Sequence, residues 1–431
     1  MARATAHVIG HTPASPDAVW AVVRDFCAPW HPMMTGCQAE TDAQGALIRA
    51  FTVAGEDTVY RERLTWVSDS DRSLAYTHLD GIAGADSYDA RLTVTPAEEG
   101  GSVITWTARI AAASARAEDI AQGTEAVFRA GIAALQTVPP PPAPPPLPSA
   151  EVALETLILD DLPRLALTVT PPRPGNADGP LVVFLHGIGG ARDNWVPQLR
   201  LAGQITRAAA LDLRGYGGSS LGLQQTTVDD YCDDILRVAE VLGADRLILV
   251  GLSYGSWIAT SFAMRHPDRL AGLVVSGGCT GMSEAGPEER EAFRISREVP
   301  LNEGQVPADF APAVVKVLIG PDAGEDTRAA LLASMAAIPA STYRDAMRCF
   351  CNPLERFDFA RLTMPVLLMT GEHDRLAPPD EIRGVAGRIL DQAPAPDVRF
   401  EVIAGAGHVC NVEKPGAYNR PLFEFLTRVA L

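Results

Sequence analysis

A serine between two glycines is the feature of this sequence best suited to carry out chemistry. Gly251-Leu-Ser-Tyr-Gly255 follows the apolar run Leu247–Val250 and precedes Ser256–Met264, where small and apolar residues recur at helical spacing. An apolar run without polar alternation predicts a strand buried on both faces. Strand, sharp turn and helix would present Ser253 Oγ at the carboxyl end of a sheet, because glycines on both sides let the strand and the helix approach.

A serine hydroxyl becomes a nucleophile when a base takes its proton, and that base needs an acid to orient it. Asp374 lies four residues after the predicted strand Val366–Thr370, and His408 lies five residues after the predicted strand Val398–Ile403. Both side chains are therefore expected at the sheet edge that carries Ser253. Ser253, Asp374 and His408 also stand in the order expected when strands of one parallel sheet supply the three groups.

Other residues leave alternatives open. Glu372 is the rival orienter, two positions before Asp374, and His373 between them is predicted to be a solvent or cap residue. His408 has a structural alternative as part of a tight glycine loop. His266 precedes Pro267 at a helix end and is predicted to cap that helix without taking part in chemistry.

Acyl transfer also needs hydrogen-bond donors for an oxyanion. The backbone N–H of Tyr254, directly after the serine, is the first candidate. The second is the N–H of Ile188, in a turn that follows the predicted strand Leu181–Leu185. Each donor would contribute about 3 kcal/mol to the transition state. The supporting residues are expected to be His186, Gly187, Gly251 and Gly255.

The elements that position these residues begin at Glu151, where strands start to alternate with helices, as in a mostly parallel sheet. The order of serine elbow, acid and histidine resembles the α/β-hydrolase family over residues 151–431. The stretch Gly405–Pro415 is similar to the 3-oxoadipate enol-lactonase branch of that family. Residues from about 281 to 356 lose the alternation and predict a helical lid over the carboxyl edge of the sheet.

This resemblance implies a serine hydrolase that cleaves a carboxylic ester or lactone through an acyl-enzyme, with no metal and no organic cofactor. One alternative keeps the triad but cleaves a C–C bond in a β-diketone. Another is a ligand-binding or interaction protein that retains the fold without turnover. Serine at the elbow argues against the epoxide hydrolases and haloalkane dehalogenases, which place aspartate there. The lid arginines have two interpretations, a clamp for a substrate carboxylate or solvated helix faces, and they are Arg294, Arg297, Arg344 and Arg348.

Residues 138–150 separate this region from the front of the chain. Eight prolines between positions 139 and 148 predict an extended, semi-rigid linker. A ligand for an SH3-type domain is the alternative interpretation.

Residues 1–137 predict an α+β domain. An opening strand Ala4–Gly10 and a helix Asp17–Phe26 precede alternating strand segments, and the helix Glu118–Gln136 closes the region. This order resembles the START-like (SRPBCC) helix-grip superfamily, which includes polyketide cyclases. The resemblance implies a hydrophobic-ligand-binding or cyclase-like domain. Candidate acid–base residues here are suggested by type alone, and they are Asp25, His31, Arg61, Glu62 and Arg63.

Composition narrows the remaining possibilities. The chain has 431 residues, 47% of them hydrophobic, and a formal net charge of −17, which argues against nucleic acid or an anionic membrane as a partner. Seven cysteines, an odd number without metal-ligand spacing, predict reduced thiols in a cytoplasmic protein. We therefore expect a small hydrophobic ester or lactone as the substrate, and the sequence leaves the oligomeric state open.

Overall fold

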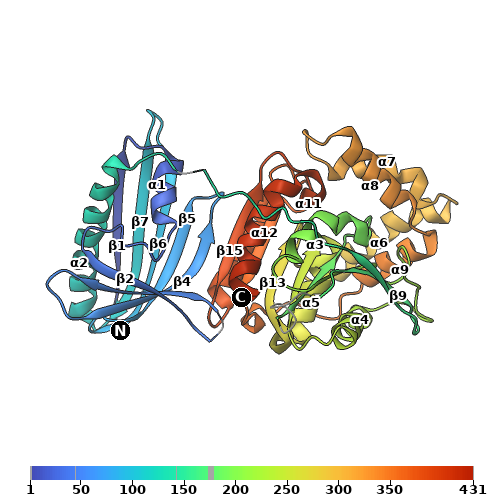
Figure 1. Cartoon of the computed structure of the whole chain (residues 1–431), viewed down its shortest axis with the longest axis horizontal. Coiled ribbons are helices and arrows are strands. Elements are labelled where there is room, and N and C mark those ends of the chain that lie inside the picture. Colours follow the sequence, from blue (N-terminus) through green and yellow to red (C-terminus); the bar gives the residue numbers. More distant parts are fainter. Residues whose placement is uncertain (1, 44, 142, 173–178, 431) are drawn as a thin grey trace. The chain divides into compact units, whose positions relative to one another are not determined.

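The chain forms two compact units (Figure 1). The computed structural model describes residues 2–43, 45–141, 143–172 and 179–430. Unit 1 comprises Met1–Pro146 together with Ala395–Glu401, and unit 2 comprises Leu147–Pro394 together with Val402–Leu431.

Unit 1 is built on an antiparallel sheet with the strand order β1-β7-β6-β5-β4-β3-β2. Its strands are β1 (Ala2–Thr12), β2 (Met34–Thr41), β3 (Leu47–Val53), β4 (Val59–Ser68), β5 (Ser73–Asp80), β6 (Ala85–Pro96) and β7 (Ser102–Ala112). The short helix α1 (Pro16–Val23) is capped at its N-terminus by Ser15, whose side chain accepts a hydrogen bond from the Ala18 N–H. The long helix α2 (Ser114–Ala134) packs along β1, β7 and β6.

The interior of unit 1 is rich in aromatic side chains. Trp106 of β7 stacks on Phe128 of α2 with ring centroids 4.3 Å apart. The Arg49 guanidinium lies 4.4 Å from the Phe26 ring and 4.9 Å from the Tyr76 ring. The predicted closing helix therefore covers the sheet through aromatic contacts.

Unit 2 contains a mostly parallel sheet with the order β8-β9-β11-β10-β12-β13-β14. The strands β10 to β14 are parallel, and β8 and β9 form an antiparallel hairpin at one edge. The bounds are β8 (Glu155–Leu159), β9 (Leu165–Val169), β10 (Leu181–Leu185), β11 (Ala208–Leu211), β12 (Leu247–Leu252), β13 (Leu270–Ser276) and β14 (Val366–Gly371). Strand β15 (Val398–Ile403) is divided between the units: its first four residues belong to unit 1, and Val402 and Ile403 belong to unit 2.

Helices cover both faces of this sheet, so its central strands are buried throughout. On one face α3 and α12 pack together and share a buried cluster with alternate sheet residues such as Val182, Ile248 and Leu367. The other face is covered by α4, α5 and α10. The bounds are α3 (Val196–Ala202), α4 (Val228–Val241), α5 (Tyr254–Arg265), α10 (Pro379–Gln392), α11 (Cys410–Glu413) and α12 (Pro415–Ala430).

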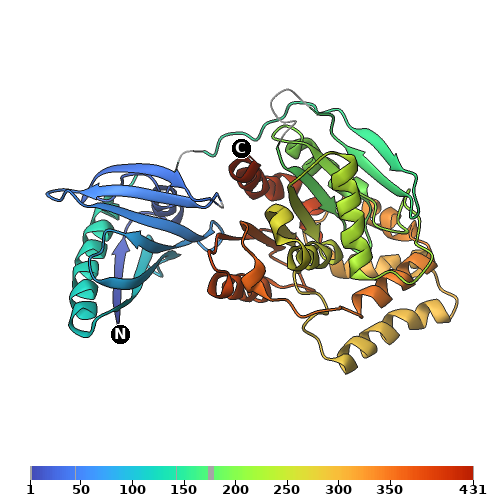
Figure 2. The same cartoon turned by 90° about the horizontal axis from the view of Figure 1, so that it is seen from below.

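Four helices between β13 and β14 form the lid. They are α6 (Pro287–Asn302), α7 (Pro307–Leu318), α8 (Glu325–Ala336) and α9 (Ala340–Phe350). The lid helices, in gold and orange, gather at one end of unit 2 (Figure 2). This insertion occupies the place in the chain that the loss of strand alternation predicts.

Several elements differ from the sequence prediction, each for a local reason. Strand β2 was not predicted because most of its residues are at least partly exposed on both faces, so it lacks an alternating pattern. The sequence pattern predicts a closing helix Arg420–Val429, but helix α12 begins at Pro415, because a proline in the first turn needs no N–H partner. The pattern also predicts a strand that ends at Leu213, but strand β11 ends at Leu211. Helix α5 begins directly after the serine, at Tyr254, and not at Ser256.

The predicted extended linker includes Pro142, which lies outside the described residues. Its described residues, 139–141 and 143–148, form neither helix nor strand.

Candidate active site

Ser253 sits in a strained turn between β12 and α5. Its φ is +55° and its ψ is −112°, in a region that non-glycine residues rarely occupy. Its N–H donates to the Ser276 carbonyl oxygen of the neighbouring strand at 2.8 Å. A Cβ at Gly251 would collide with the Gly255 backbone, and a Cβ at Gly255 would collide with the Leu185 carbonyl oxygen. Both glycines are therefore required by backbone contacts, and Ser253 remains partly exposed.

Asp374 and His408 form a buried pair, each only 4% exposed. His408 Nδ1 lies 2.9 Å and 3.0 Å from the two carboxylate oxygens of Asp374. Because an ionised carboxylate can only accept, Nδ1 carries the proton and Nε2 of the neutral ring has a free lone pair.

Asp374 is held in its ionised form by four donors. The N–H groups of Leu376 and Ala377 donate to its Oδ1 at 2.8 Å and 2.9 Å, and the Thr370 hydroxyl donates to its Oδ2 at 3.3 Å. Burial by itself would raise the pKa of this carboxyl, but the hydrogen bonds from His408 and the backbone lower the pKa overall. The pair can thus stabilise a protonated imidazole during a reaction.

Two consecutive glycines directly after β13 lie against both the candidate serine and the candidate histidine. A Cβ at Gly277 would lie 3.2 Å from Nδ1 and Cε1 of His408, and a Cβ at Gly278 would lie 3.9 Å from the Ser253 Cα. Both glycines have positive φ, +59° and +135°. The His408 ring and the Ser253 backbone therefore border the same glycine corner. Sequence reasoning missed this corner, although a Gly-Gly pair directly after a buried strand was visible.

The predicted oxyanion turn lies directly against the serine. A Cβ at Gly187 would be 3.4 Å from the Ser253 Cβ, and Ile188 is the next residue. The buried His186 ring braces this turn, since Nδ1 lies 2.7 Å from the Gly187 carbonyl oxygen and Nε2 accepts the Leu213 N–H at 3.1 Å. Burial lowers the pKa of His186, which favours the neutral ring that these two contacts need.

The Tyr254 side chain points into the interior of unit 2. Its ring packs at 5.5 Å from Trp257 of the same helix and at 5.6 Å from Phe350, the last residue of lid helix α9. The lid thus contacts the residue whose N–H is the first candidate oxyanion donor.

Glu372 and His373 lie near the pair but make different contacts. The Glu372 carboxylate is 54% exposed and accepts the Gly405 N–H at 2.9 Å. His373 is partly exposed and lies 3.8 Å from the same carboxylate. Of the two candidate acids, Asp374 is the one that contacts the His408 ring.

The lid arginines converge on one carboxylate of their own lid. Glu298 of α6, 5% exposed, is contacted by Arg294 of α6 and by Arg344 and Arg348 of α9. Arg297 instead lies 4.9 Å from the Phe293 ring. These contacts tie α6 to α9 and engage all four side chains within the lid.

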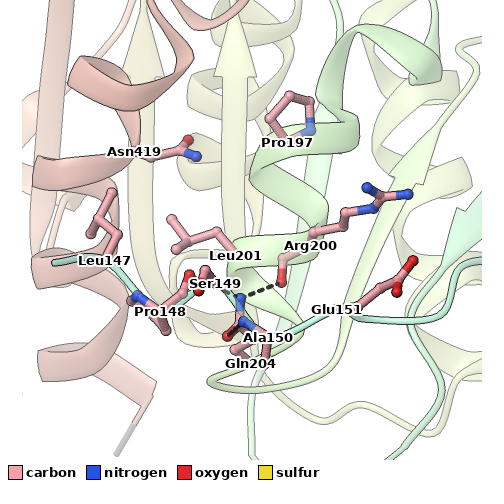
Figure 3. Close-up of a pocket in the computed structure, with 10 residues that line it drawn as sticks. All are labelled: Leu147, Pro148, Ser149, Ala150, Glu151, Pro197, Arg200, Leu201, Gln204 and Asn419. Carbon is pink, nitrogen blue, oxygen red and sulfur yellow. Dashed lines mark hydrogen bonds between the residues drawn. The ribbon is translucent and has the colours of Figure 1, made fainter.

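A pocket of about 270 Å³ lies away from these residues (Figure 3). It is formed where the start of unit 2 runs along α3 and α12. Gln204 holds this segment, since it accepts the Ala150 N–H at 3.2 Å and donates to the Pro148 carbonyl oxygen at 3.3 Å. The lining residues are Leu147, Pro148, Ser149, Ala150, Glu151, Pro197, Arg200, Leu201, Gln204 and Asn419. Neither Ser253 nor His408 lines this pocket.

The candidate residues of unit 1 do not converge. Glu62 pairs with the buried Arg49, its Oε2 lying 2.7 Å from Nε. Arg61 contacts Glu40, and His31 Nε2 lies 3.0 Å from the Val127 carbonyl oxygen. Arg63 pairs with Asp42, so these four side chains serve separate local contacts.

The part of the chain that the structure describes shows neither a metal-binding cluster nor a membrane-spanning helix. Residues 2–43, 45–141, 143–172 and 179–430 contain no group of three or more His, Cys, Asp or Glu side chains placed to hold a metal ion. In the same part of the chain, no helix is both long enough and apolar enough to cross a membrane.

Comparison with known families places both halves of the chain. Residues 180–415 match the alpha/beta hydrolase fold family, which is more than half of the sequence. The chain therefore belongs to the α/β-hydrolase family. Residues 1–138 match the family described as polyketide cyclase / dehydrase and lipid transport. The predicted combination of a START-like region with a C-terminal α/β-hydrolase is confirmed.

Individual relatives agree with this assignment. RutD of Caulobacter vibrioides (strain NA1000 / CB15N), a candidate carbamate hydrolase, is 30% identical over 252 residues, which cover 57% of this chain and 90% of RutD. A thermophilic esterase from Thermogutta terrifontis has a TM-score of 0.55 at 24% identity, covering 65% of this chain and all of that one. The enol-lactonase from Burkholderia xenovorans LB400 has a TM-score of 0.52 at 23% identity, covering 62% and 97% of the two chains. The two structures share the fold of unit 2.

Proposed function

We propose that unit 2 cleaves a carboxylic ester or lactone through an acyl-enzyme on Ser253. The observation that carries this proposal is the glycine corner at Gly277 and Gly278, which borders both the strained serine turn and the His408–Asp374 pair. A nucleophile, a base with a free Nε2 and an orienting carboxylate are the three parts that such catalysis needs.

The proposed reaction has two halves. His408 Nε2 takes the Ser253 hydroxyl proton as Oγ attacks the substrate carbonyl carbon, and the resulting oxyanion accepts hydrogen bonds from the N–H groups of Ile188 and Tyr254. Collapse of the tetrahedral intermediate breaks the C–O bond, and His408 returns the proton to the leaving alcohol. Water then attacks the acyl-enzyme with His408 again as the base, which releases the acid and restores Ser253.

The relatives suggest which acyl groups to test. Their names refer to an esterase, an enol-lactonase and a carbamate hydrolase, and these substrates share a carbonyl carbon with an oxygen or nitrogen leaving group. Carbamate cleavage is the second candidate reaction, because RutD is 30% identical to this chain over 90% of its own length. Both candidates use the same three side chains.

Turnover by the full chain tests this function directly. Ser253→Ala should lower hydrolysis of p-nitrophenyl acetate or a small lactone by roughly 10⁴-fold or more, because it removes the hydroxyl that attacks the substrate carbonyl. A fluorophosphonate probe should label the wild-type chain and leave Ser253→Ala unlabelled. A panel that includes carbamates and β-diketones separates ester cleavage from the alternative reactions. Equal activity of the wild type and Ser253→Ala would show that another residue is the nucleophile.

We also propose that residues 1–137 bind a hydrophobic ligand, with residues 138–150 as the linker and 151–431 as the hydrolase domain. Support comes from the family match and from the aromatic interior around Trp106 and Phe128. A bound ligand should raise the unfolding temperature of this part of the chain. An aromatic alcohol such as 1-naphthol, added to full-length Ser253→Ala, tests this, and an unchanged melting curve would contradict it.

A further inference from the structure

Glu413 is the last residue of the short helix α11 (Cys410–Glu413) and lies five residues after the candidate base His408. Its carboxylate bridges two segments that are distant in the sequence. Glu413 Oε1 accepts the Gly407 N–H at 2.9 Å, and Oε2 accepts the Gly320 N–H at 2.7 Å. Gly407 directly precedes His408, and Gly320 lies two residues after lid helix α7.

The backbones that Glu413 joins are already in close contact. The His408 N–H donates to the Leu318 carbonyl oxygen at 2.6 Å. This bond supplies a partner for one of the last carbonyl groups of α7, which have none within the helix. A Cβ at Gly407 would collide with the Leu318 carbonyl oxygen, and a Cβ at Gly320 would lie 2.7 Å from the Gly405 carbonyl oxygen. The end of the lid helix and the histidine loop therefore meet through backbone atoms.

The position of the histidine loop is also fixed from the sheet side. A Cβ at Gly371, the last residue of β14, would collide with the Gly407 carbonyl oxygen. The loop is thus enclosed between β14 and the end of α7, and Glu413 is the side chain that accepts hydrogen bonds from both the loop and the lid segment.

We propose that Glu413 is a positioning residue that couples the lid to the base, by holding Gly407 and Gly320 so that the His408 ring stays aligned with Asp374 and Ser253. This inference rests on the proposed function for its catalytic meaning. A small displacement of a catalytic group can lower turnover by roughly 10²-fold, so a bridge one residue from the base has a measurable effect.

Glu372 supplies a matched control. It is also a glutamate whose carboxylate accepts an N–H of the same loop, that of Gly405 at 2.9 Å, but its side chain is 54% exposed. Glu413 differs from it in being partly buried and in accepting the additional N–H from the lid segment. A comparison of the two positions therefore isolates the bridge.

The experiment compares Glu413→Gln and Glu372→Gln in the full chain. Glu413→Gln should lower kcat by roughly 10- to 100-fold with KM nearly unchanged, and should slow fluorophosphonate labelling by a similar factor. It should also broaden the far-downfield proton resonance of the His408–Asp374 hydrogen bond. Glu372→Gln should leave all three readouts close to wild type. An unchanged resonance and kcat in folded Glu413→Gln would overturn the proposal.

Two further measurements keep the test decisive. Glu413→Asp retains the charge but is one methylene shorter, so it should lose one of the two hydrogen bonds and show the same pattern more weakly. In the wild-type chain, the N–H groups of Gly320 and Gly407 should exchange slowly with solvent, and fast exchange of both would contradict the bridge even if no variant folds.

The failure of this proposal differs from a failure of the proposed function. A wild-type chain that hydrolyses no ester and resists the probe would overturn the function, whereas the response of the His408–Asp374 resonance to Glu413→Gln needs no turnover. An active wild type with equally active Glu413 variants would overturn the positioning role alone.

Discussion

At the residue scale, the properties of His408 depend on the carboxylate beside it. Asp374 is almost fully buried, and a buried carboxylate is stable only when donors surround it. Its donors come from the His408 ring, from a hydroxyl and from two N–H groups of the following turn. The same arrangement fixes the Nδ1–H tautomer, which leaves Nε2 to act as the base.

Asp374→Asn should lower turnover by roughly 10⁴-fold, because an amide can donate to Nδ1 and thereby favour the wrong tautomer. Steady-state hydrolysis of the best ester substrate by the full chain measures the effect. Glu372→Gln is the control and should stay within about twofold of wild type, because the Glu372 carboxylate is 54% exposed and contacts the Gly405 N–H, not the His408 ring.

Stability measured against pH gives an independent check on Asp374. Its pKa is lower in the folded chain, so ionised Asp374 stabilises the fold at neutral pH, and this contribution is lost as the pH falls through the folded-state pKa. The difference in unfolding free energy between wild type and Asp374→Asn should therefore be largest near neutral pH and should shrink below about pH 4. Urea unfolding at several pH values measures it, and a difference that grew in acid would contradict the assignment.

At the element scale, the site depends on places where two backbones approach too closely for a side chain. The serine elbow and the histidine loop have this property, and at Gly277 an added Cβ would lie 3.0 Å from the His408 carbonyl oxygen. Strands and helices bring the residues to one edge of the sheet, but these glycine contacts determine how near they come.

Gly277→Ala should therefore lower activity by more than its effect on thermal stability would account for. Alanine would have to adopt the φ of +59° that Gly277 has, which is strained for a residue with a side chain. Its Cβ would also lie 3.2 Å from the His408 ring, so the ring must move. We expect kcat to fall by roughly 10-fold or more, since misplacement by a fraction of an ångström matters in catalysis. Ester hydrolysis and thermal unfolding of the same preparation measure the two effects.

Gly387→Ala is the matched substitution elsewhere in unit 2. Gly387 lies inside helix α10, and nothing stands within 4 Å of its added Cβ. Alanine there should raise stability by up to about 1 kcal/mol through helix propensity and leave kcat unchanged. Similar losses of activity in both variants would mean that the corner has no special role.

At the scale of the whole molecule, each unit has its own buried core. The core of unit 1 contains aromatic side chains of α2 and the antiparallel sheet, and that of unit 2 contains apolar side chains of the parallel sheet and its helices. Separate cores favour separate unfolding transitions. Unit 1 also contains the buried ion pair of Arg49 and Glu62, whose side chains are only 7% and 8% exposed.

Arg49→Met should destabilise unit 1 by about 3–5 kcal/mol, because it leaves the Glu62 carboxylate buried without its partner. Calorimetry of the full chain should show one transition at a lower temperature and the other unchanged, with ester hydrolysis by unit 2 retained. The double variant Arg49→Met, Glu62→Leu should recover most of the loss, since an apolar pair of similar volume needs no solvation. If Arg49→Met alone lowered the temperatures of both transitions equally, the units would unfold together.

Much of the architecture could be predicted from the sequence because the signals are local. Apolar runs such as Leu247–Val250 predict buried parallel strands, alternation predicts the antiparallel strands of unit 1, and the proline run separates the two regions. Each side chain of the proposed triad follows a strand end, so its place in the chain already indicates the edge of the sheet. Weak or very short elements, such as β2 and α11, carry no such local signal.

Only the tertiary structure decided which groups meet. The ion pair of Arg348 with Glu298 and the hydrogen bond between the Glu413 carboxylate and the Gly320 N–H both join residues from separate elements. Local sequence specifies the conformation of a few residues at a time, whereas these contacts arise when packed backbones leave space for one side chain and exclude another. That selection depends on the whole fold, so no pattern along the chain could have expressed it.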